Sequence, residues 1–312
     1  MSDTKSPKAR AAARRSGSRR SATGGRKTRR LGVLKTYKIY VGGKFPRTES
    51  GRFYQVLDRD GAPLANACQS SRKDFREAVV VARAAFRDWS SSSAYLRAQI
   101  LYRIGEMLEG RRGQFVDELY AQGGTRAAAM REVDATIDLL VYYAGWADKY
   151  QQVFSSVNPV ASSHFNFSLR EPTGVVSLLA PQDSPLLGLV ANLAPAVAGG
   201  NTCVALASEA RPLAAVSFAE VLHSSDVPGG VVNILTGRQA ELLEHFASHM
   251  DVNAIVYCGS NRDVATRVET LAAGNIKRVV VREAAPGNED VGDPYLISAT
   301  QEVKTTWHPI GR

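Results

Sequence analysis

The sequence predicts an α/β protein built on a doubly wound, mostly parallel Rossmann-type sheet preceded by long helices. From residue 153 onward, five short apolar runs rich in Val, Ile and Leu alternate with helical stretches: GVVSLLA, TCVALA, GVVNILTG, NAIVYCG and KRVVVRE. Such runs are typical of parallel strands that are buried on both faces. Before residue 151, long segments instead repeat their apolar residues at helical spacing. This change of period along the chain predicts helices first and the sheet second.

The first half begins with two expected strands and continues with a capped helix. Residues 37–58 are typical of a strand, a Gly-Gly turn and a second strand. Residues 70–89 predict a helix in which Ser71 and Asp74 have the spacing of a capping box. Four apolar residues of this helix fall on one stripe: Phe75, Val79, Ala82 and Phe86.

Two further helical segments complete the first half. Residues 94–124 predict one or two helices that end at Gly123-Gly124, and residues 130–150 predict another long amphipathic helix. The aromatic residues of the second segment have the spacing of a packed face, so we expect them in the core.

The net charge of +9 belongs to the N-terminus. Residues 1–30 contain eleven basic residues and one acid, whereas the other residues contain 28 basic and 29 acidic groups. This segment lacks aromatic and β-branched aliphatic residues, which predicts a disordered basic tail. Such a tail could be a solvated extension, an organelle transit peptide, or a binding segment for nucleic acid, an acidic protein or a membrane surface.

The cysteine and histidine patterns predict neither a disulfide framework nor a metal site. Cys68, Cys203 and Cys258 lie far apart, and this sparse usage favours a reducing cytoplasm. His245 and His249 have i, i+4 spacing, but no nearby residue completes a ligand set, so we expect an ordinary helix face. We also expect no secretory signal and no transmembrane helix.

Ligands of doubly wound sheets bind beyond the carboxyl ends of the strands, where this sequence places several polar residues. Glu209 follows one predicted strand and could accept hydrogen bonds from ribose hydroxyls. Gly259 and Ser260 follow another, at a strand-to-helix junction that favours an anion. Ser260 could equally be a plain N-cap of the following helix.

Five segments occur in a fixed order between residues 37 and 283: YVGGKF, VYYAGWADKY, REPTGVVSLLAPQDSPLLGLVANLAPAVAGGNT, DVPGGVVNILTG and IVYCGSNRDVATRV. Each resembles a motif of the aldehyde dehydrogenase superfamily. The resemblance implies a nucleotide-binding-type domain over residues 31–285, with an oligomerisation hairpin near 151–171. Residues 286–312 would then form a linker and the C-terminal oligomerisation strand, whose EVKTTW resembles the family's EVKTVW.

The resemblance also implies a dinucleotide cofactor, NAD or NADP. Its candidate contacts are Pro181, Gln182, Glu209, Gly237, Gly259 and Ser260.

Several positions depart from the family pattern at its chemical centre. Gln182 stands where the family has Trp, Leu206 where it has a ribose-binding Lys, and Val264 where it has the second Gly of the phosphate motif. Asp183 replaces the Asn that helps to form the oxyanion hole, so a donor becomes an acceptor. The general-base Glu aligns with Arg282, with Glu283 one residue later.

The family's thiol nucleophile has no counterpart, since no cysteine follows residue 258. We therefore assign no catalytic residue and expect a catalytically incompetent subunit that assembles with itself or with a full-length aldehyde dehydrogenase. Two alternatives stay open. The chain could be an NAD(P)-dependent oxidoreductase acting on an aldehyde, alone or in a complex. It could also be a binding protein that engages nucleic acid or an acidic partner through the basic tail.

Overall fold

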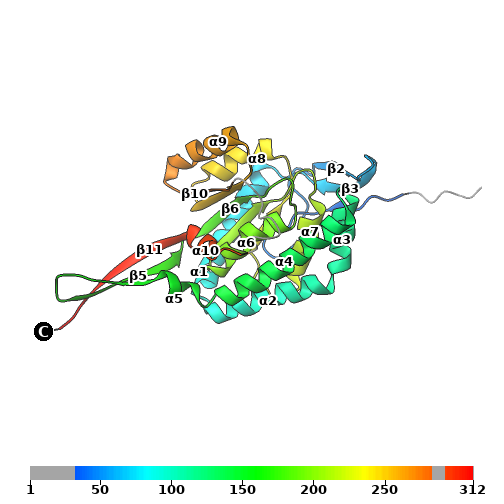
Figure 1. Ribbon diagram of the computed structural model, residues 1–312. Coiled ribbons are helices and arrows are strands. Elements are labelled where there is room, and N and C mark those ends of the chain that lie inside the picture. The colour runs from blue at the N-terminus through cyan, green and yellow to red at the C-terminus, as the bar shows by residue number, and fades with distance from the viewer. Residues whose placement is uncertain (1–31, 283–291, 312) are drawn as a thin grey trace, which may run out of the picture. The chain divides into compact units, whose positions relative to one another are not determined.

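The computed structural model describes residues 32–282 and 292–311 (Figure 1). The chain divides into two units, Met1–Val33 and Leu34–Arg312, and the helices and strands of the described residues belong to the second. The basic tail predicted at residues 1–30 lies outside the described residues. So do Glu283 and the first part of the predicted linker.

A sheet of five parallel strands in the order β10-β9-β6-β7-β8 confirms the predicted fold class. Its strands are β6 (Val175–Leu179), β7 (Thr202–Leu206), β8 (Val232–Leu235), β9 (Ala254–Cys258) and β10 (Arg278–Arg282). All residues of the first four are buried, as expected for strands covered on both faces. The chain adds β7 and β8 on one side of β6 and then β9 and β10 on the other. The strand order therefore reverses between β6 and β9.

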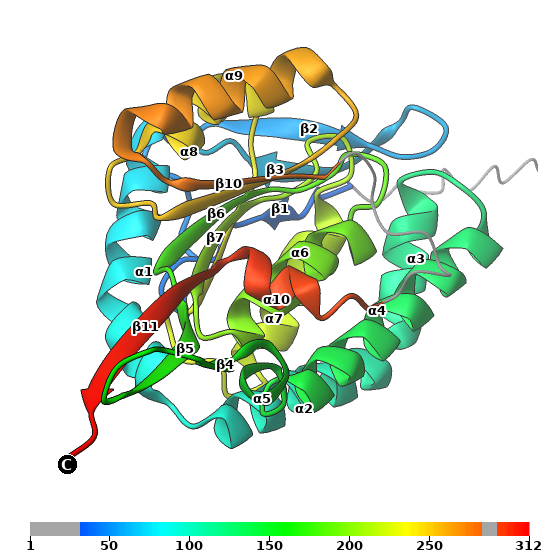
Figure 2. The same cartoon turned by 60° about the vertical axis from the view of Figure 1, so that its left-hand side comes forward.

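Helices cover both faces of this sheet (Figure 2). One face carries α6 (Leu187–Ala198) and α7 (Leu213–His223). The other carries α1 (Arg72–Ser91), α8 (Gln239–Ser248) and α9 (Arg262–Ala272), which continues into a short 3-10 turn, η1 (Ala273–Asn275). The capping box predicted for α1 is present, and three of the four residues predicted on its stripe are fully buried: Phe75, Val79 and Ala82.

Three more helices form a layer outside α6 and α7: α2 (Ala94–Gly110), α3 (Arg112–Ala121) and α4 (Arg126–Trp146). They confirm the predicted helices, including the end before Gly123-Gly124. Tyr143 is fully buried, whereas Tyr142 and Trp146 are partly buried and pack against the same core.

A small sheet in the order β1-β3-β2 lies at the start of the unit. It comprises β1 (Thr36–Tyr37), β2 (Phe53–Leu57) and β3 (Pro63–Cys68). Sequence reasoning missed β3, whose PLANAC has no β-branched or aromatic residue to indicate a strand. The predicted turn is present, since Gly42 and Gly43 adopt φ angles of +62° and +76°. Tyr40 just before it exchanges two backbone hydrogen bonds with Ile234 and closes the β8 edge of the main sheet.

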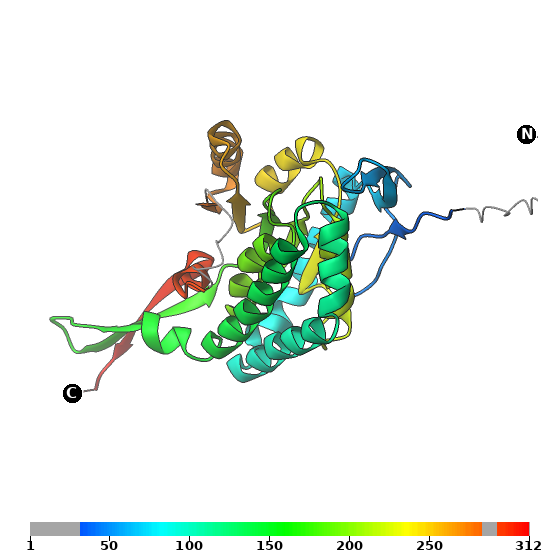
Figure 3. The same ribbon diagram turned by 45° about the vertical axis from the view of Figure 1, so that its right-hand side comes forward.

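The third sheet brings together segments from the middle and the end of the chain. It is antiparallel, in the order β11-β5-β4, and extends away from the main sheet (Figure 3). Its strands are β4 (Ser156–Asn158), β5 (His164–Pro172) and β11 (Gln301–Pro309); the helix α10 (Tyr295–Ala299) leads into β11. The hairpin predicted near 151–171 begins later than expected, because residues up to 154 form the short helix α5 (Tyr150–Phe154).

Candidate functional site

A cleft of about 620 Å³ opens at the carboxyl ends of β6 and β9, where the strand order reverses. This reversal is the usual ligand-binding position of open parallel sheets. The cleft is lined by Ala180, Pro181, Gln182, Asp183, Gln239, Tyr257, Cys258, Gly259, Ser260, Asn261 and Val264. Four of the six predicted cofactor contacts are among these residues, and only Glu209 and Gly237 are not.

The side chain of Gln182 ties the turn after β6 to neighbouring segments. Its Oε1 accepts a hydrogen bond from the Glu209 backbone N at 2.8 Å, and its Nε2 donates to Gln239 Oε1 at 3.2 Å. The Arg211 guanidinium donates to the backbone oxygens of Gln182 and Asp183. These bonds fix the backbone of the turn, and the exposed Asp183 side chain lines the cleft.

The carboxylate of Glu132 in α4 accepts hydrogen bonds at the N-terminus of α6, beside this turn. Glu132 Oε1 accepts from the backbone N atoms of Leu186 at 2.9 Å and Leu187 at 3.2 Å. Ser184 Oγ lies 3.4 Å from the same oxygen and accepts from Gly188 N at 3.0 Å. An acid at this end of a helix also interacts favourably with the helix dipole. Sequence reasoning missed Glu132, because no local pattern links it to a turn about fifty residues later.

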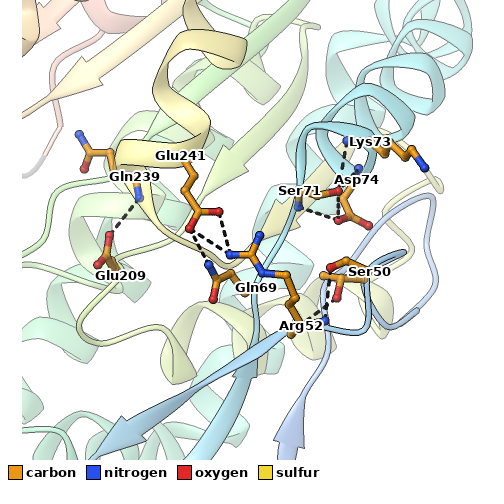
Figure 4. A network of polar contacts seen from close by, with 10 residues as sticks. Ser50, Arg52, Gln69, Ser71, Lys73, Asp74, Glu209, Gln239 and Glu241 are labelled. Atoms are coloured by element: carbon orange, nitrogen blue, oxygen red, sulfur yellow. Dashed lines mark hydrogen bonds and ion pairs between the residues drawn. The ribbon is translucent and has the colours of Figure 1, made fainter.

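Glu209, the predicted ribose acceptor, has its carboxylate engaged by the segment after β8. Arg238 Nη1 donates to Glu209 Oε1 at 2.6 Å, and the Gln239 backbone N donates to Oε2 at 2.9 Å. Figure 4 shows the latter contact beside a second network, in which Arg52 and Gln69 both donate to Glu241. Charge-assisted bonds of this kind are among the stronger ones in proteins.

The predicted contact Gly237 has a packing role in the structure. A Cβ added there would lie 3.2 Å from the Ser70 backbone N and 3.3 Å from Leu242 Cδ1. The missing side chain therefore allows the end of β8 to approach the segment before α1.

The junction between β9 and α9 is capped by Asn261. Its Oδ1 accepts from the backbone N atoms of Asp263 at 3.0 Å and Val264 at 3.2 Å, so the alternative of Ser260 as the N-cap is wrong. The backbone N of Gly259 donates to the Arg282 oxygen at 2.8 Å. The Tyr257 hydroxyl lies over Gly259, where an added Cβ would meet it at 2.6 Å. Burial raises the pKa of Tyr257, and a hydrogen bond with the Asn261 backbone opposes that rise.

A hydrogen bond between β10 and α6 lies close to Cys258. Arg282 Nη1 donates to Asn192 Oδ1 at 2.8 Å. Burial raises the pKa of the nearby Cys258 thiol; the charge of Asp183 adds to this rise, whereas Arg282 and Asn192 oppose it. Burial also raises the pKa of Cys203 strongly. The thiols of both residues are therefore kept protonated near neutral pH.

Comparisons with known proteins agree with this geometry. Residues 46–285 match the model of the aldehyde dehydrogenase family. The chain belongs to that family. Among curated relatives, it is 28% identical over 257 residues to cytosolic 10-formyltetrahydrofolate dehydrogenase of Mus musculus, covering 80% of this chain and 28% of that protein. It is 30% identical over 249 residues to mitochondrial benzaldehyde dehydrogenase of Antirrhinum majus, covering 78% of this chain and 46% of that one.

A solved NAD+ complex of aldehyde dehydrogenase from Bacillus cereus has the same fold. It is 25% identical with a TM-score of 0.75, and the match covers 79% of this chain and 50% of that one. The chain thus spans half or less of the length of these relatives.

The structure describes two positions that the sequence resemblance aligns with catalytic groups of the family. Arg282, which the resemblance aligns with the general base, carries a guanidinium that has N–H donors and no acceptor. Asp183, which the resemblance aligns with the oxyanion-hole Asn, brings a carboxylate to the cleft. The three cysteines are all buried: Cys68, Cys203 and Cys258. Among the described residues, no group of His, Cys, Asp and Glu could hold a metal ion.

The cofactor that the family implies does not fit the α9 end of the cleft. A pyrophosphate needs backbone N–H groups and close approach to the helix. Here Asn261 Oδ1 already accepts from two N–H groups of the first turn, those of Asp263 and Val264, and the Val264 side chain lines the cleft beside them. No step of a reaction can therefore be assigned through this position.

Proposed function

We propose that this chain is an aldehyde dehydrogenase-family subunit that has no turnover by the family's thiol route and acts through assembly. The observation that carries the proposal is strand β11, which forms the edge of its sheet and is exposed at every residue after Gln301. An open, partly apolar edge of this length favours pairing with another strand. The proposal includes the cytoplasmic location expected from the sparse cysteines. No helix among the described residues is long and apolar enough to cross a membrane.

Loss of turnover is supported by the protonation states of the groups near the cleft. Covalent oxidation of an aldehyde needs a thiolate and a base. The pKa of the Cys258 thiol is raised, and Arg282 cannot serve as a base. We therefore expect no aldehyde-dependent reduction of NAD or NADP by the purified chain.

In β4 and β5, one face of the third sheet is apolar and the other is polar, and β11 adds Val303 and Trp307 to the polar face. The apolar face exposes Val157, Phe165 and Leu169 by 67%, 45% and 39%. The polar face carries a ladder in which Asn158 Nδ2 donates to Ser168 Oγ at 2.9 Å, and Ser168 Oγ lies 2.8 Å from Thr305 Oγ1. A sheet of three strands with an uncovered apolar face is stabilised by a partner.

The sequence of β11 is complementary to itself about Thr305. Antiparallel pairing of two copies centred there would place Val303 of one copy opposite Trp307 of the other, twice. These side chains are 52% and 57% exposed. The same register would place Glu302 opposite His308 of the other copy, an acid against a ring that can donate a hydrogen bond. Both kinds of cross-strand pair are favourable, so a second copy of the chain is the partner that this edge fits best.

A disulfide test follows from this register. Thr305→Cys places two cysteines opposite each other on the two-fold axis, within disulfide reach, and the native cysteines are buried. We expect the variant to form a covalent dimer under mild oxidation, while light scattering shows a wild-type dimer. Thr306→Cys is the matched control, because its side chain would face Lys304 of the other copy.

Two outcomes would contradict self-assembly. One is a monomer at a concentration of about 100 μM, well above the Kd of a stable dimer. The other is equal rates of cross-linking for the two cysteine variants. Recovery of a full-length aldehyde dehydrogenase by the tagged chain would point to a mixed assembly instead.

A further inference from the structure

We infer that the protein's own side chains close the cleft at the ends of β6 and β9 to NAD and NADP. This inference rests partly on the proposed loss of turnover. The groups responsible lie near the end of β9, at the start of α9 and after β7. They are Tyr257 in β9, Asn261, Asp263 and Val264 at the start of α9, and Glu209 after β7.

Two backbone donors in the first turn of α9 are already used. An anion binds at a helix N-terminus because the first N–H groups have no partner within the helix. In this chain Asn261 Oδ1 accepts from Asp263 N and Val264 N at 3.0 and 3.2 Å. Gly259 N donates to the Arg282 oxygen at 2.8 Å. A phosphate that used these donors would have to displace the Asn261 amide oxygen and the Arg282 backbone oxygen.

Two side chains take up the space that a phosphate would need. The Tyr257 hydroxyl lies over Gly259, and Tyr257 is only 4% exposed, so the ring cannot turn away freely. The Val264 side chain lines the cleft from the first turn of α9. Close approach of a pyrophosphate to a helix requires small residues at such positions.

Two carboxylates near this end oppose the binding of a dinucleotide. Asp183 lines the cleft across from α9, and Asp263 lies in the first turn of that helix. Both side chains are exposed carboxylates, and both would repel a pyrophosphate.

The predicted ribose contact, Glu209, does not line the cleft and already has partners. Both oxygens of Glu209 accept hydrogen bonds, from Arg238 Nη1 at 2.6 Å and from the Gln239 backbone N at 2.9 Å. Leu206, at the end of β7, is apolar and 2% exposed, so it supplies no donor. A ribose would have to break a charge-assisted pair to be bound here.

The test is a gain of binding by the full chain. Saturation-transfer NMR with NAD+ and with NADP+ should show no saturable binding to the wild type up to about 5 mM, which is a free energy weaker than about −3 kcal/mol. The triple variant Tyr257→Phe/Asp263→Asn/Val264→Gly removes the hydroxyl, one charge and the branched side chain. We expect it to bind at least about tenfold more tightly, with saturation below about 0.5 mM.

The control separates opening of the cleft from loosening of the helix. Thr266→Gly lies on an exposed position of α9 outside the cleft and carries the same backbone cost as Val264→Gly. It should not bind either cofactor. Saturable binding by the wild type, or by Thr266→Gly, would overturn the inference. So would a triple variant with a native circular dichroism spectrum that fails to bind.

The proposed function fails separately, on the oligomeric state. A wild-type dimer that binds NAD+ would refute only the closed cleft, whereas a monomer that binds no cofactor would refute only the assembly.

Discussion

Replacement of Glu132 by alanine should destabilise the protein through the N-terminus of α6. Its Oε1 accepts from two backbone N atoms at 2.9 and 3.2 Å, and hydrogen bonds to a charged group contribute about 1.5–3 kcal/mol each. Favourable interaction with the helix dipole adds about 0.3–1 kcal/mol. Water can replace part of this at a half-buried site. We therefore expect a loss of about 2–4 kcal/mol in the free energy of unfolding.

Urea denaturation followed by tryptophan fluorescence measures this loss. With a slope of about 3 kcal/mol per M for a chain of this size, the midpoint should fall by about 1 M. Glu132→Gln keeps an acceptor oxygen but not the charge, so its midpoint should lie between those of wild type and Glu132→Ala. Glu77→Ala, an exposed position of α1, is the control and should leave the midpoint unchanged.

The reasoning would be refuted by a midpoint for Glu132→Ala within experimental error of the wild type. Equal losses for alanine and glutamine would show that the charge, rather than the acceptor geometry, is what matters. The turn that Glu132 supports also forms one wall of the cleft. The same variant should therefore speed backbone hydrogen exchange at Leu186 and Leu187.

Two further predictions concern the opposite face of the sheet. Asp74→Ala should lower the free energy of unfolding by about 1–3 kcal/mol in the same assay, because the buried carboxylate accepts from Ser71 N at 2.7 Å and Glu49 N at 2.8 Å. Lys277 has its pKa lowered to about 8 by burial, so below that pH its charge destabilises the folded state. Between about pH 8 and pH 10.5 the unfolded chain binds the additional proton, so the stability of the wild type relative to Lys277→Met should rise with pH.

Matched controls exist for both. Asp88→Ala changes an exposed acid near the other end of α1 and should leave stability within about 0.5 kcal/mol. Lys38→Met removes an exposed lysine and should show no relative change over the same pH range. A flat pH dependence of the difference between wild type and Lys277→Met would contradict the lowered pKa.

Local rules account for much of the fold that the sequence predicted. The Ser71–Asp74 spacing is a short-range signal, and the structure has the capping box at that position. The five apolar runs predict a parallel sheet, since strands covered on both faces need apolar side chains at nearly every position. β3 was not predicted, because its residues form a strand in the structure but have little intrinsic preference for one.

The candidate site was predictable only in part. Pro181, Gln182, Gly259 and Ser260 could be placed at the cleft, because parallel strands end at the same edge of a sheet. Their partners could not be predicted. Nothing near Gln182 in the sequence indicates that its side chain bonds to the backbone of Glu209, and nothing near Glu209 indicates Arg238. Asn261 was a detectable signal, since an asparagine two residues before an acid is typical of an N-cap.

The sequence by itself determined most of the elements and the fold family, because these depend on residue type and on spacing along the chain. Only the tertiary structure decided which side chains line the cleft and which hydrogen bonds they make. The carboxylate of Glu132 at α6 and the pairing of β11 with β5 are contacts between distant segments that are set by packing. Residues 164–172 and 301–309 meet in register across more than a hundred residues, and no local preference specifies such a pairing.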